Sequence, residues 1–591
     1  MGVIYSHSGR RIKMLFSFAI TIIILLQPLL GFSQKIEEQG LPFITNYSPK
    51  DFGTLPQTWS AIEDKRGIMY FGVQGTIVEF DGVKWRKVQL PVNGAVARSF
   101  AKDKNGTVYY GAVGDFGYLG SDSLGQTIAI SLTKYIPESK RQFFDVWTVY
   151  TTEEGIFFQS REYIFRLNKK NEVKVWSPQT KFMYAFYLDD TYYVHEQGIG
   201  LFKLINDSLQ LIPGSEFLGQ ERMNVMLPYT PPGVTDNKTG KQYLVGLFYG
   251  GLFVFDGKSF RPFVTEADDL IKTATLYKAA RLANGNYALS TTGKGLVIID
   301  DRGKVIQLLN RGVGLQDESV YGVYPDSRGT LWLSLDNGIS RVDMDSPLSQ
   351  FTNQSGISTS TLSLMRFNGV LYVGTTNGLL RFNEKNRLFE IVNGIPQNQT
   401  FTLAKDDHSL LVANDGLFGV KDNKVSVLRS SIGGDLQLSG LYSPKDHPNI
   451  LFGGATFGTA VFSRKDASKN WAFAGMVPKL DNQFWTFGEN NDGTVWAGTQ
   501  SGVIYRVNLV FDEKGDPDVS KFTFRKFGEK DGLRKGTGGV WRIKNENYFP
   551  GDSAIYKFDD KIAAKAWVPG LPSYSRTDRN YIQLTNVASY F

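Results

Sequence analysis

The sequence predicts an all-β protein built from two consecutive β-propellers of four-stranded blades, and three observations carry this prediction. A motif recurs along the 591 residues: Asp-x-x-Gly, a short aromatic strand ending in a small residue, then a tight turn and another strand. Glycine is abundant, with 62 residues, which suits a turn-rich β protein. No apolar period of 3.6 residues follows residue 33. A motif that repeats at a fixed spacing determines the architecture before any single residue does.

The chain begins with the features of an export signal. Three basic residues lie between positions 10 and 13, and the uncharged apolar run 15–26 follows them. Small residues then favour cleavage after Ser33. An uncleaved signal anchor is the alternative, but the apolar run is shorter than the roughly 20 residues that a membrane helix needs. We therefore expect 1–33 to be a signal peptide and the mature chain to be periplasmic or otherwise extracytoplasmic.

The small residue that ends the aromatic strand marks twelve repeat units. The steps between these markers average about 43 residues, which is the period of a four-stranded propeller blade. The markers are Gly72, Gly111, Gln159, His195, Gly246, Ser290, Ser334, Gly374, Ala413, Gly453, Gly498 and Phe549.

Each unit contains short strands joined by tight turns. In the seventh unit, a strand at 319–325 leads through the turn 326–329 into a second strand at 330–335. The turn 336–338 then leads to a third strand at 339–343. Asp-x-x-Gly and Asn-Gly turns supply the positive φ that tight hairpins require. A fourth, outer strand recurs at 85–90, 260–264, 388–392 and 524–528.

One outer strand, Phe43–Tyr47, has no inner strands before it. Ring closure requires such a strand, because it pairs with the last blade and removes an open edge. We expect it to complete the blade at 320–343, and 350–353 to do the same for a second ring. The offset between Asn46 and Asn353 is 307 residues, or seven units of about 44.

These offsets divide the chain into a first seven-bladed propeller at 34–347 and a second propeller at 348–591. The start of a thirteenth unit lies at 579–591, so about one and a half blades of the second ring are missing. We therefore expect a truncated second ring. Two six-bladed rings, or one large ring, are the alternatives.

Composition excludes several classes of function. Cysteine is absent, which removes disulfides, thiolate metal sites and a cysteine nucleophile. The four histidines, at positions 7, 195, 408 and 447, do not have metal-ligand spacing, so we expect no metal and no cofactor. Lys and Arg number 65 against 58 Asp and Glu, and this mild excess predicts no direct nucleic-acid binding.

The repeat resembles that of two-component regulator propellers. The segments 319–343, 361–383 and 483–508 match its pattern, and 41–85 is similar to the opening of such sensors. The resemblance implies a periplasmic double propeller that binds a small molecule or an oligosaccharide. In that family a three-Tyr domain, a membrane helix and a kinase or DNA-binding domain follow. We expect these output modules to be absent from this chain. The chain then holds the sensing half, and we expect it not to be an enzyme. A homodimer is compatible with this reading.

Candidate ligand-binding residues lie where each innermost strand begins, because these positions line the central channel of a propeller. Aromatic faces suit sugar rings, and Arg or Asn side chains suit their hydroxyl groups. The alternative is that the aromatic residues pack between blades as core. Arg98 and Asn224 are the stronger candidates, because a polar residue at an apolar-flanked position needs a partner. The candidates are Trp59, Arg98, Trp147, Tyr184, Asn224, Tyr321, Trp485 and Trp541.

Two other classes of function stay open. A propeller glycan hydrolase or lyase needs carboxylates or a His/Arg/Tyr set at one channel mouth. His195 and Glu196 are adjacent on a strand and point to opposite faces, so we do not expect them to form an acid–base pair. A non-catalytic protein-interaction scaffold needs a broad exposed patch. The segment 111–120 is either a binding loop or a glycine-rich hairpin, and 229–242 is expected to be a solvent loop.

Overall fold

The computed structural model describes residues 40–571 except 234–240, 433, 468, 491, 500–501, 532, 534–537, 544–545, 552–554 and 559–566. The predicted signal peptide, the predicted thirteenth unit and half of the insert at 229–242 lie outside the described residues. The chain divides into two compact units, one at Gly40–Gln350 and one that begins at Phe351. The predicted boundary between 347 and 348, and the predicted truncation, stay predictions.

Seven four-stranded antiparallel sheets form the described part of the first unit, and each runs from an inner to an outer strand. Six of them follow chain order: β2 (Thr58–Glu63), β3 (Met69–Val73), β4 (Thr76–Phe80), β5 (Trp85–Gln89); β6 (Ala97–Lys102), β7 (Val108–Ala112), β8 (Asp115–Ser121), β9 (Thr127–Ser131); β10 (Thr148–Thr152), β11 (Gly155–Gln159), β12 (Ile164–Leu167), β13 (Val173–Trp176); β14 (Phe182–Leu188), β15 (Thr191–Glu196), β16 (Gly200–Ile205), β17 (Ser208–Leu211); β18 (Met223–Tyr229), β19 (Gln242–Leu247), β20 (Gly251–Phe255), β21 (Phe260–Pro262); β22 (Leu276–Arg281), β23 (Tyr287–Thr291), β24 (Leu296–Ile299) and β25 (Val305–Leu309). The seventh contains β26 (Val320–Pro325), β27 (Thr330–Leu335), β28 (Gly338–Asp343) and β1 (Phe43–Tyr47).

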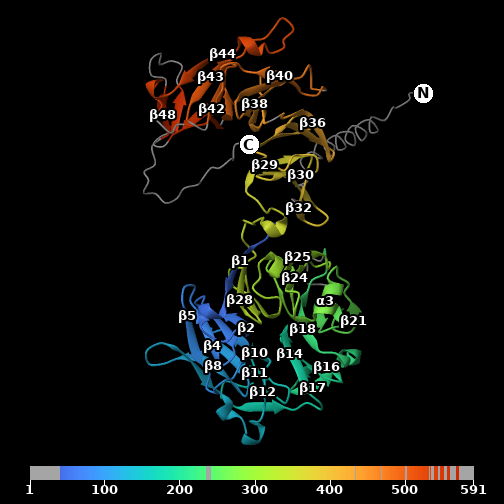
Figure 1. The fold of residues 1–591 in the computed structure, drawn as a ribbon. Coiled ribbons are helices and arrows are strands. Elements are labelled where there is room, and N and C mark those ends of the chain that lie inside the picture. Colours follow the sequence, from blue (N-terminus) through green and yellow to red (C-terminus); the bar gives the residue numbers. More distant parts are fainter. Residues whose placement is uncertain are drawn as a thin grey trace, which may run out of the picture. The chain divides into compact units, whose positions relative to one another are not determined.

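The inner strands of these sheets contact one another in a cycle. β2, β6, β10, β14, β18, β22 and β26 are neighbours in that order, and β26 also contacts β2. Figure 1 shows the sheets, coloured from blue to green, around a common centre. This cyclic order is that of a seven-bladed propeller, so the predicted fold class is confirmed. The core lies between neighbouring blades, where Tyr70 of the first blade and Tyr110 of the second are fully buried in one cluster.

The orphan outer strand pairs as the sequence predicts. β1 is antiparallel to β28, from Phe43 opposite Asp343 to Tyr47 opposite Ile339. The Tyr47 ring lies 5.3 Å from Trp85 of the first blade and 6.0 Å from Trp332 of the seventh. The start of the unit therefore completes its last blade and leaves no free edge there.

The marker residues lie on the second strand of each described sheet, and their small size has a steric cause. A Cβ atom at Gly72 would lie 2.1 Å from the carbonyl oxygen of Ala97, on the inner strand of the next blade. In the second unit, a Cβ at Gly454 would lie 1.9 Å from the carbonyl oxygen of Phe484. The predicted marker Gly453 is thus one residue early, because Gly454 takes the tight position opposite Gly440.

A β-bulge recurs near the start of the inner strands. In β2 the pairing with β3 shifts between Thr58 and Ser60, which leaves Trp59 outside the ladder. A bulge bends its strand and redirects a side chain. Six of the seven inner strands of the first unit carry such a shift. The shifts fall at Trp59, Arg98, Met183–Tyr184, Asn224, Tyr277 and Tyr321.

Among the described residues, two short α-helices interrupt the β pattern, and the sequence did not predict them. They are α2 (Pro49–Phe52) and α3 (Asp268–Ala274). α3 has two acidic residues in its first turn and buries Ile271 and Ala274. Its seven residues are too few to show a helical period in the sequence. Short 3-10 turns lie at Thr133–Tyr135, Glu138–Lys140, Glu216–Gln220, Arg311–Val313, Asn353–Ser355, Val519–Lys521 and Glu529–Asp531.

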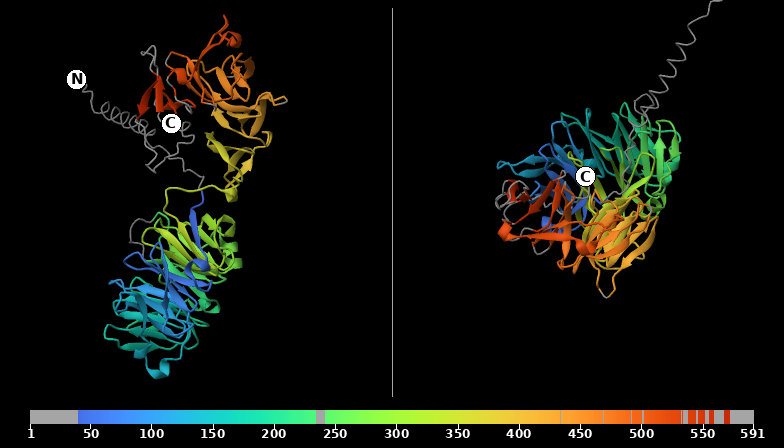
Figure 2. Two further views of the ribbon diagram at one scale, coloured as in Figure 1. Left: turned by 60° about the vertical axis from the view of Figure 1, so that its left-hand side comes forward. Right: turned by 90° about the horizontal axis from the view of Figure 1, so that it is seen from above.

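The second unit contains five four-stranded antiparallel sheets among its described residues, coloured yellow to red in Figures 1 and 2. Their strands are β29 (Thr361–Phe367), β30 (Val370–Thr375), β31 (Gly378–Asn383), β32 (Leu388–Ile391); β33 (Thr402–Lys405), β34 (Leu410–Asn414), β35 (Gly416–Lys421), β36 (Lys424–Ser430); β37 (Leu438–Tyr442), β38 (Ile450–Ala455), β39 (Gly458–Ser463), β40 (Ala472–Met476); β41 (Phe484–Glu489), β42 (Val495–Thr499), β43 (Ile504–Asn508), β44 (Thr523–Phe527); β45 (Trp541–Ile543), β46 (Glu546–Pro550), β47 (Ile555–Phe558) and β48 (Trp567–Leu571).

The segment 350–353 does not form the expected outer strand of this unit. Gln350 instead forms a bridge with Leu41, and a 3-10 turn begins at Asn353. Phe351 packs on Phe389, with ring centres 5.4 Å apart.

The close approach at Gly72 gives a first prediction. Gly72→Ala places a methyl group against the rigid Ala97 carbonyl, so the first propeller should lose about 1–3 kcal/mol of stability or more. The control is Gly312→Ala, because a Cβ there meets only the Asn310 side chain at 3.1 Å. Urea unfolding of the full chain, with hydrogen exchange of peptides from β2 to β7, measures the loss. Equal stability of the two variants would contradict the steric account.

A candidate ligand-binding channel in the first propeller

Five of the predicted residues lie at the centre of the first propeller: Trp59, Arg98, Trp147, Tyr184 and Tyr321. The Arg98 guanidinium lies 3.7 Å from the ring centre of Trp59 and 5.1 Å from that of Trp147. Trp59 of the first blade stacks on Tyr321 of the seventh blade, with ring centres 4.6 Å apart. Because Trp59, Arg98 and Tyr321 are bulged residues, the irregular pairing is what turns them toward one another.

The remaining blades complete this cluster. Tyr184 lies 5.8 Å from Trp147, and Tyr277 lies 5.2 Å from Tyr321. Between them, the Arg222 guanidinium is 6.0 Å from Tyr184 and 5.8 Å from Tyr277. Every blade therefore supplies at least one side chain. We call the set the channel cluster: Trp59, Arg98, Trp147, Tyr184, Arg222, Tyr277, Lys278 and Tyr321.

Three members of the cluster are absent from the predicted set. Tyr277 occupies the same bulge as Trp59, so an alignment of the sixth unit with the first could have found it. Lys278 follows Tyr277 and lies 4.4 Å from the Tyr184 ring centre. Arg222 precedes β18, outside the repeated strand, and no sequence signal marks it.

Asn224 was a strong candidate, but its contacts are with the blade scaffold. Its side chain is 2% exposed, and its amide nitrogen donates to the Leu276 carbonyl at 3.0 Å. This bond joins β18 to β22. Among the described contacts, Asn224 makes none with the aromatic rings of the channel cluster.

Burial keeps the phenols of the channel cluster neutral. It raises the pKa of Tyr184 and of Tyr277, and it raises the pKa of Tyr321 to about 12 with a further contribution from the Asp336 charge. The Tyr321 hydroxyl donates to the Asp336 carboxylate at 3.1 Å. Burial, and then the charge of Arg222, lowers the pKa of Lys278 to about 8.

The charged groups of the channel cluster are mostly cationic. Arg98 forms an ion pair with Asp145 at 2.6 Å, and these side chains are 15% and 26% exposed. Arg222 and Lys278 have no ion-pair partner among the described residues of this unit. Phe248 packs 3.9 Å from the Arg222 guanidinium and holds its face by a cation–π contact.

The two candidates of the second unit do not form a comparable cluster in the described part of the chain. Trp485 is the bulged residue of β41, and its ring lies 5.0 Å from Phe401. Trp541 begins β45, and no ring contact joins it to Trp485 among the described residues. The structure therefore concentrates the predicted positions in the first propeller.

His195 and Glu196 lie in separate buried networks. The Nε2 atom of His195 lies 2.9 Å from the Leu218 carbonyl oxygen, and burial lowers the pKa of this histidine to about 4. The Glu196 carboxylate accepts from the Thr180 backbone N–H at 2.7 Å. The two side chains thus stabilise two different loops. The segment 111–120 is a β7–β8 hairpin in which buried Asp115 accepts from the Tyr110 hydroxyl at 2.7 Å.

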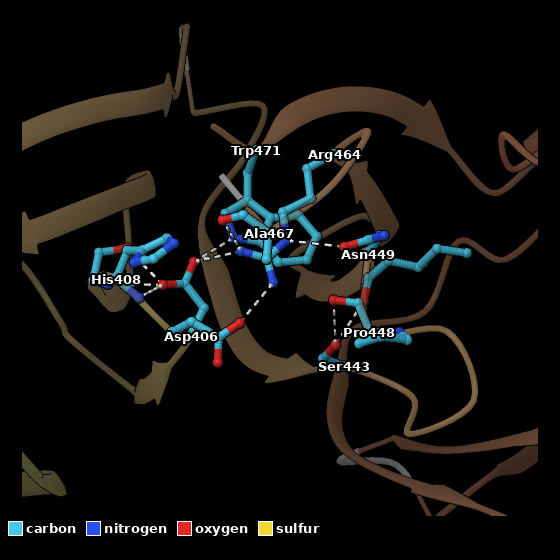
Figure 3. Close-up of polar contacts among 11 residues, drawn as sticks. Asp406, His408, Ser443, Pro448, Asn449, Arg464, Ala467 and Trp471 are labelled. Atoms are coloured by element: carbon cyan, nitrogen blue, oxygen red, sulfur yellow. Dashed lines mark hydrogen bonds and ion pairs between the residues drawn. The ribbon is translucent and has the colours of Figure 1, made fainter. Parts of the chain in front are cut away.

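A buried polar network in the second unit also has a structural explanation (Figure 3). Arg464 and Asp406 pair at 3.2 Å, with side chains only 4% and 9% exposed. The Trp471 indole N–H donates to Asp406 at 2.9 Å, and the Arg464 guanidinium lies 4.5 Å from the Trp471 ring centre. Asp406 also caps its own turn by accepting from the His408 backbone at 2.8 Å. The network joins adjacent blades and has all its groups paired.

A hollow in the first unit lies at the other end of the inner strands. It has a volume of about 600 Å³ and lies beside the turns that end β6, β10 and β14, in the second, third and fourth blades. Its lining mixes Tyr109, Tyr118 and Tyr187 with acidic and basic side chains. A hollow of about 320 Å³ lies at the equivalent turns of the sixth and seventh blades. Such hollows therefore follow from the spacing of adjacent turns.

The described residues contain no group of three or more His, Asp or Glu side chains arranged to hold a metal ion. They also include no helix with the length and apolar character needed to cross a membrane.

Three solved structures are similar to this chain to different degrees. The extracellular domain of a hybrid two-component system from B. thetaiotaomicron superposes with a TM-score of 0.63 at 15% identity, over 88% of this chain and 71% of that one. The extracellular domain of a one-component system from the same organism gives 0.42 at 15% identity, over 90% and 79%. A structure of streptogramin B lyase gives a TM-score of 0.36 at 12% identity, over 51% of this chain and 97% of that one. No family model and no curated protein matches the chain.

The first similarity defines the class of fold: this chain has the architecture of the extracellular domain of a two-component-type system. That is the fold which the resemblance of the repeat predicts. At 15% identity the similarity carries the fold and not the ligand.

The lowered pKa of Lys278 gives a second prediction. The folded pKa is about 8 and the unfolded value is near 10.4, so the charged lysine destabilises the fold fully below pH 8. This cost falls as the pH rises from 8 to 10.4. Lys278→Met should therefore stabilise the first propeller by about 1–3 kcal/mol at pH 7, with the gain vanishing toward pH 10.4. Urea unfolding across this range tests it, with exposed Lys258→Met as control; a pH-independent gain would contradict it.

The network around Asp406 gives a third prediction. Burial alone would raise the pKa of Asp406, but hydrogen bonds from the His408 backbone and Trp471 outweigh it and lower the pKa. Its stabilising effect is therefore present above the unfolded pKa near 3.9, and it disappears as the pH falls through the folded value. Asp406→Asn should cost about 2–4 kcal/mol at pH 7, because it leaves Arg464 buried with only the distant, exposed Asp407 as a counter-charge.

Urea unfolding with hydrogen exchange of β33–β40 measures this loss. The control is Asp407→Asn, because that side chain is 71% exposed and lies 3.9 Å from Arg464. A loss of the same size in both variants would refute a special role for Asp406.

Proposed function

We propose that this chain is the extracytoplasmic ligand-binding region of a two-component-type signalling protein, and that the ligand contacts the channel cluster. One observation carries the proposal: all seven blades of the first propeller direct at least one aromatic or cationic side chain to the same place. A closed scaffold has no need to gather such side chains from every repeat. The fold of an extracellular domain of a hybrid two-component system supports an extracytoplasmic location.

The ligand that best suits the cluster contains sugar rings. Trp59, Trp147 and Tyr321 are half-buried, so part of each ring is open to a partner. Aromatic faces of this kind stack on the apolar faces of sugars, while Arg98 and Lys278 donate to their oxygen atoms. An oligosaccharide is therefore the proposed class of ligand. A kinase or DNA-binding module, as the resemblance of the repeat implies, would carry the output.

The geometry gives less support to an enzyme. A glycan hydrolase needs two carboxyl groups facing one substrate. The carboxylates beside the cluster, Asp145 and Asp336, are already held by Arg98 and by Tyr321 and Gln57. A binding function needs no further group, so it accounts for the cluster more simply.

This proposal gives a fourth prediction. The full chain is titrated with a panel of neutral and acidic oligosaccharides while intrinsic tryptophan fluorescence and calorimetric heat are followed. Trp59→Ala and Trp147→Ala should each weaken binding by about tenfold or more, because each removes a stacking surface worth 1–2 kcal/mol.

The control for these titrations is Tyr109→Ala, which alters the hollow at the other end of the inner strands. It should bind like the unchanged protein. Loss of binding in Tyr109→Ala with full binding in Trp59→Ala would move the site to that hollow, and no response to any glycan would reject the sugar ligand.

A further inference from the structure

The buried polar atoms of the channel cluster that lack a partner are all hydrogen-bond donors. They are the indole N–H groups of Trp59 and Trp147, the Nη1 group of Arg98 and the Nε group of Arg222. Indole and guanidinium nitrogens donate and do not accept. From this imbalance we propose that the ligand of the channel carries an oxyanion group, that is, a carboxylate, sulfate or phosphate. The inference deepens the proposed ligand-binding function and rests on it.

A buried donor without an acceptor costs about 1–3 kcal/mol, so natural folds rarely keep four together. The scaffold beside the cluster offers little to meet them. Asn224 Oδ1 is an unpaired acceptor nearby, on a residue that is bonded to the Leu276 carbonyl, and the unpaired hydroxyls of Ser60 and Ser334 can donate as well as accept. Because the unpaired groups of the cluster itself are all donors, the complementary ligand is rich in acceptors.

The charges near the cluster also favour an anionic ligand. Arg98, Arg161, Arg222 and Lys278 surround the aromatic rings, and only Arg98 has an ion-pair partner among the described residues. Glu221 is the sequence neighbour of Arg222, but its carboxylate accepts from the Tyr249 backbone at 3.2 Å. Partly buried cations need a counter-charge, and three of these four have none in the part of the chain that the structure describes.

The aromatic contacts fix the arginines in a useful orientation. Trp59 covers a face of the Arg98 guanidinium at 3.7 Å, and Phe248 covers a face of Arg222 at 3.9 Å. The N–H groups of a guanidinium lie in its plane, so a covered face leaves its edge accessible. At that edge Arg98 Nε donates to Asp145, whereas Arg98 Nη1 and Arg222 Nε lack a partner. Such edges bind planar or tetrahedral oxyanions in a bidentate manner.

Anion binding should also change the protonation of Lys278. Its pKa is lowered to about 8 because burial and Arg222 disfavour the charge. An oxyanion beside it would favour the charged form and raise that pKa again. The hollow at the other end of the strands differs, because there Asp103, Glu153 and Asp190 balance Lys104 and Lys169.

The test uses the full chain and inorganic sulfate as the simplest oxyanion, at constant ionic strength kept with sodium chloride. Sulfate should quench tryptophan fluorescence saturably and raise the unfolding temperature. Arg222→Gln should weaken this apparent affinity by about tenfold or more. The matched control is Arg281→Gln, because Arg281 is exposed at the far end of β22, the strand that carries Lys278. Sulfate also stabilises proteins non-specifically, so the difference between the two variants is the decisive quantity.

A second measurement does not depend on any variant. In protein with ¹³C-methylated lysines, the NMR titration of Lys278 should move to higher pH when sulfate is added at constant ionic strength. The same sample with chloride alone should show no change.

Three results would contradict the proposal that the ligand carries an oxyanion group. They are an equal sulfate response in Arg222→Gln and Arg281→Gln, an unmoved Lys278 titration, and binding of neutral galactotriose but not of trigalacturonate. Neutral binding that Trp59→Ala abolishes would refute the anion and keep the proposed function. No response to sulfate or to either trisaccharide would reject both.

Discussion

The structure of the first propeller depends on how closely one blade approaches the next near the central axis. A Cβ at Gly72 would be 2.1 Å from the Ala97 carbonyl oxygen, so backbone packs directly on backbone there. A Cβ at Gly374 in the second unit would meet the Thr400 carbonyl at 2.5 Å. Inner strands can converge on a narrow channel only where the second strand of the preceding blade carries no bulky side chain. This contact is the reason that a small residue recurs at this position of the repeat.

The bulge places a second side chain of the inner strand beside the same contact. Ala97 supplies the carbonyl that approaches Gly72, and the next residue, Arg98, is the one left outside the ladder. In the second unit Phe484 and Trp485 repeat this arrangement against Gly454. One residue thus seals the blade interface while its neighbour faces the channel. The scaffold position tolerates little change, whereas the bulged position is free to differ from blade to blade, and there Trp, Arg, Tyr and Asn alternate.

The sequence predicted more of the scaffold than of the candidate site, and particular residues show why. The period, the second strands and the pairing of β1 with β28 follow from a motif that repeats, because steric and turn requirements are the same in every blade. Tyr277 shares that motif and was recoverable. Arg222 was not, because it lies before β18 and reaches the cluster through a contact with Phe248 that no local pattern encodes. Asn224 occupies the bulged position, but its side chain bonds to the Leu276 carbonyl instead of joining the cluster. Only the three-dimensional structure distinguishes these two possibilities.

The two ends of the inner strands therefore have different physical characters. At the turn end, buried charges are matched: Asp406, Arg464 and Trp471 satisfy one another, and the hollow at Tyr109 balances its acids and bases. At the channel end, four donors and three cations are left without partners in the described protein. An unmet group costs about 1–3 kcal/mol, and a closed ring can carry that cost because β1 leaves no edge to fray. A ligand that meets those donors binds the folded ring and not the unfolded chain, so its occupancy must stabilise the whole propeller.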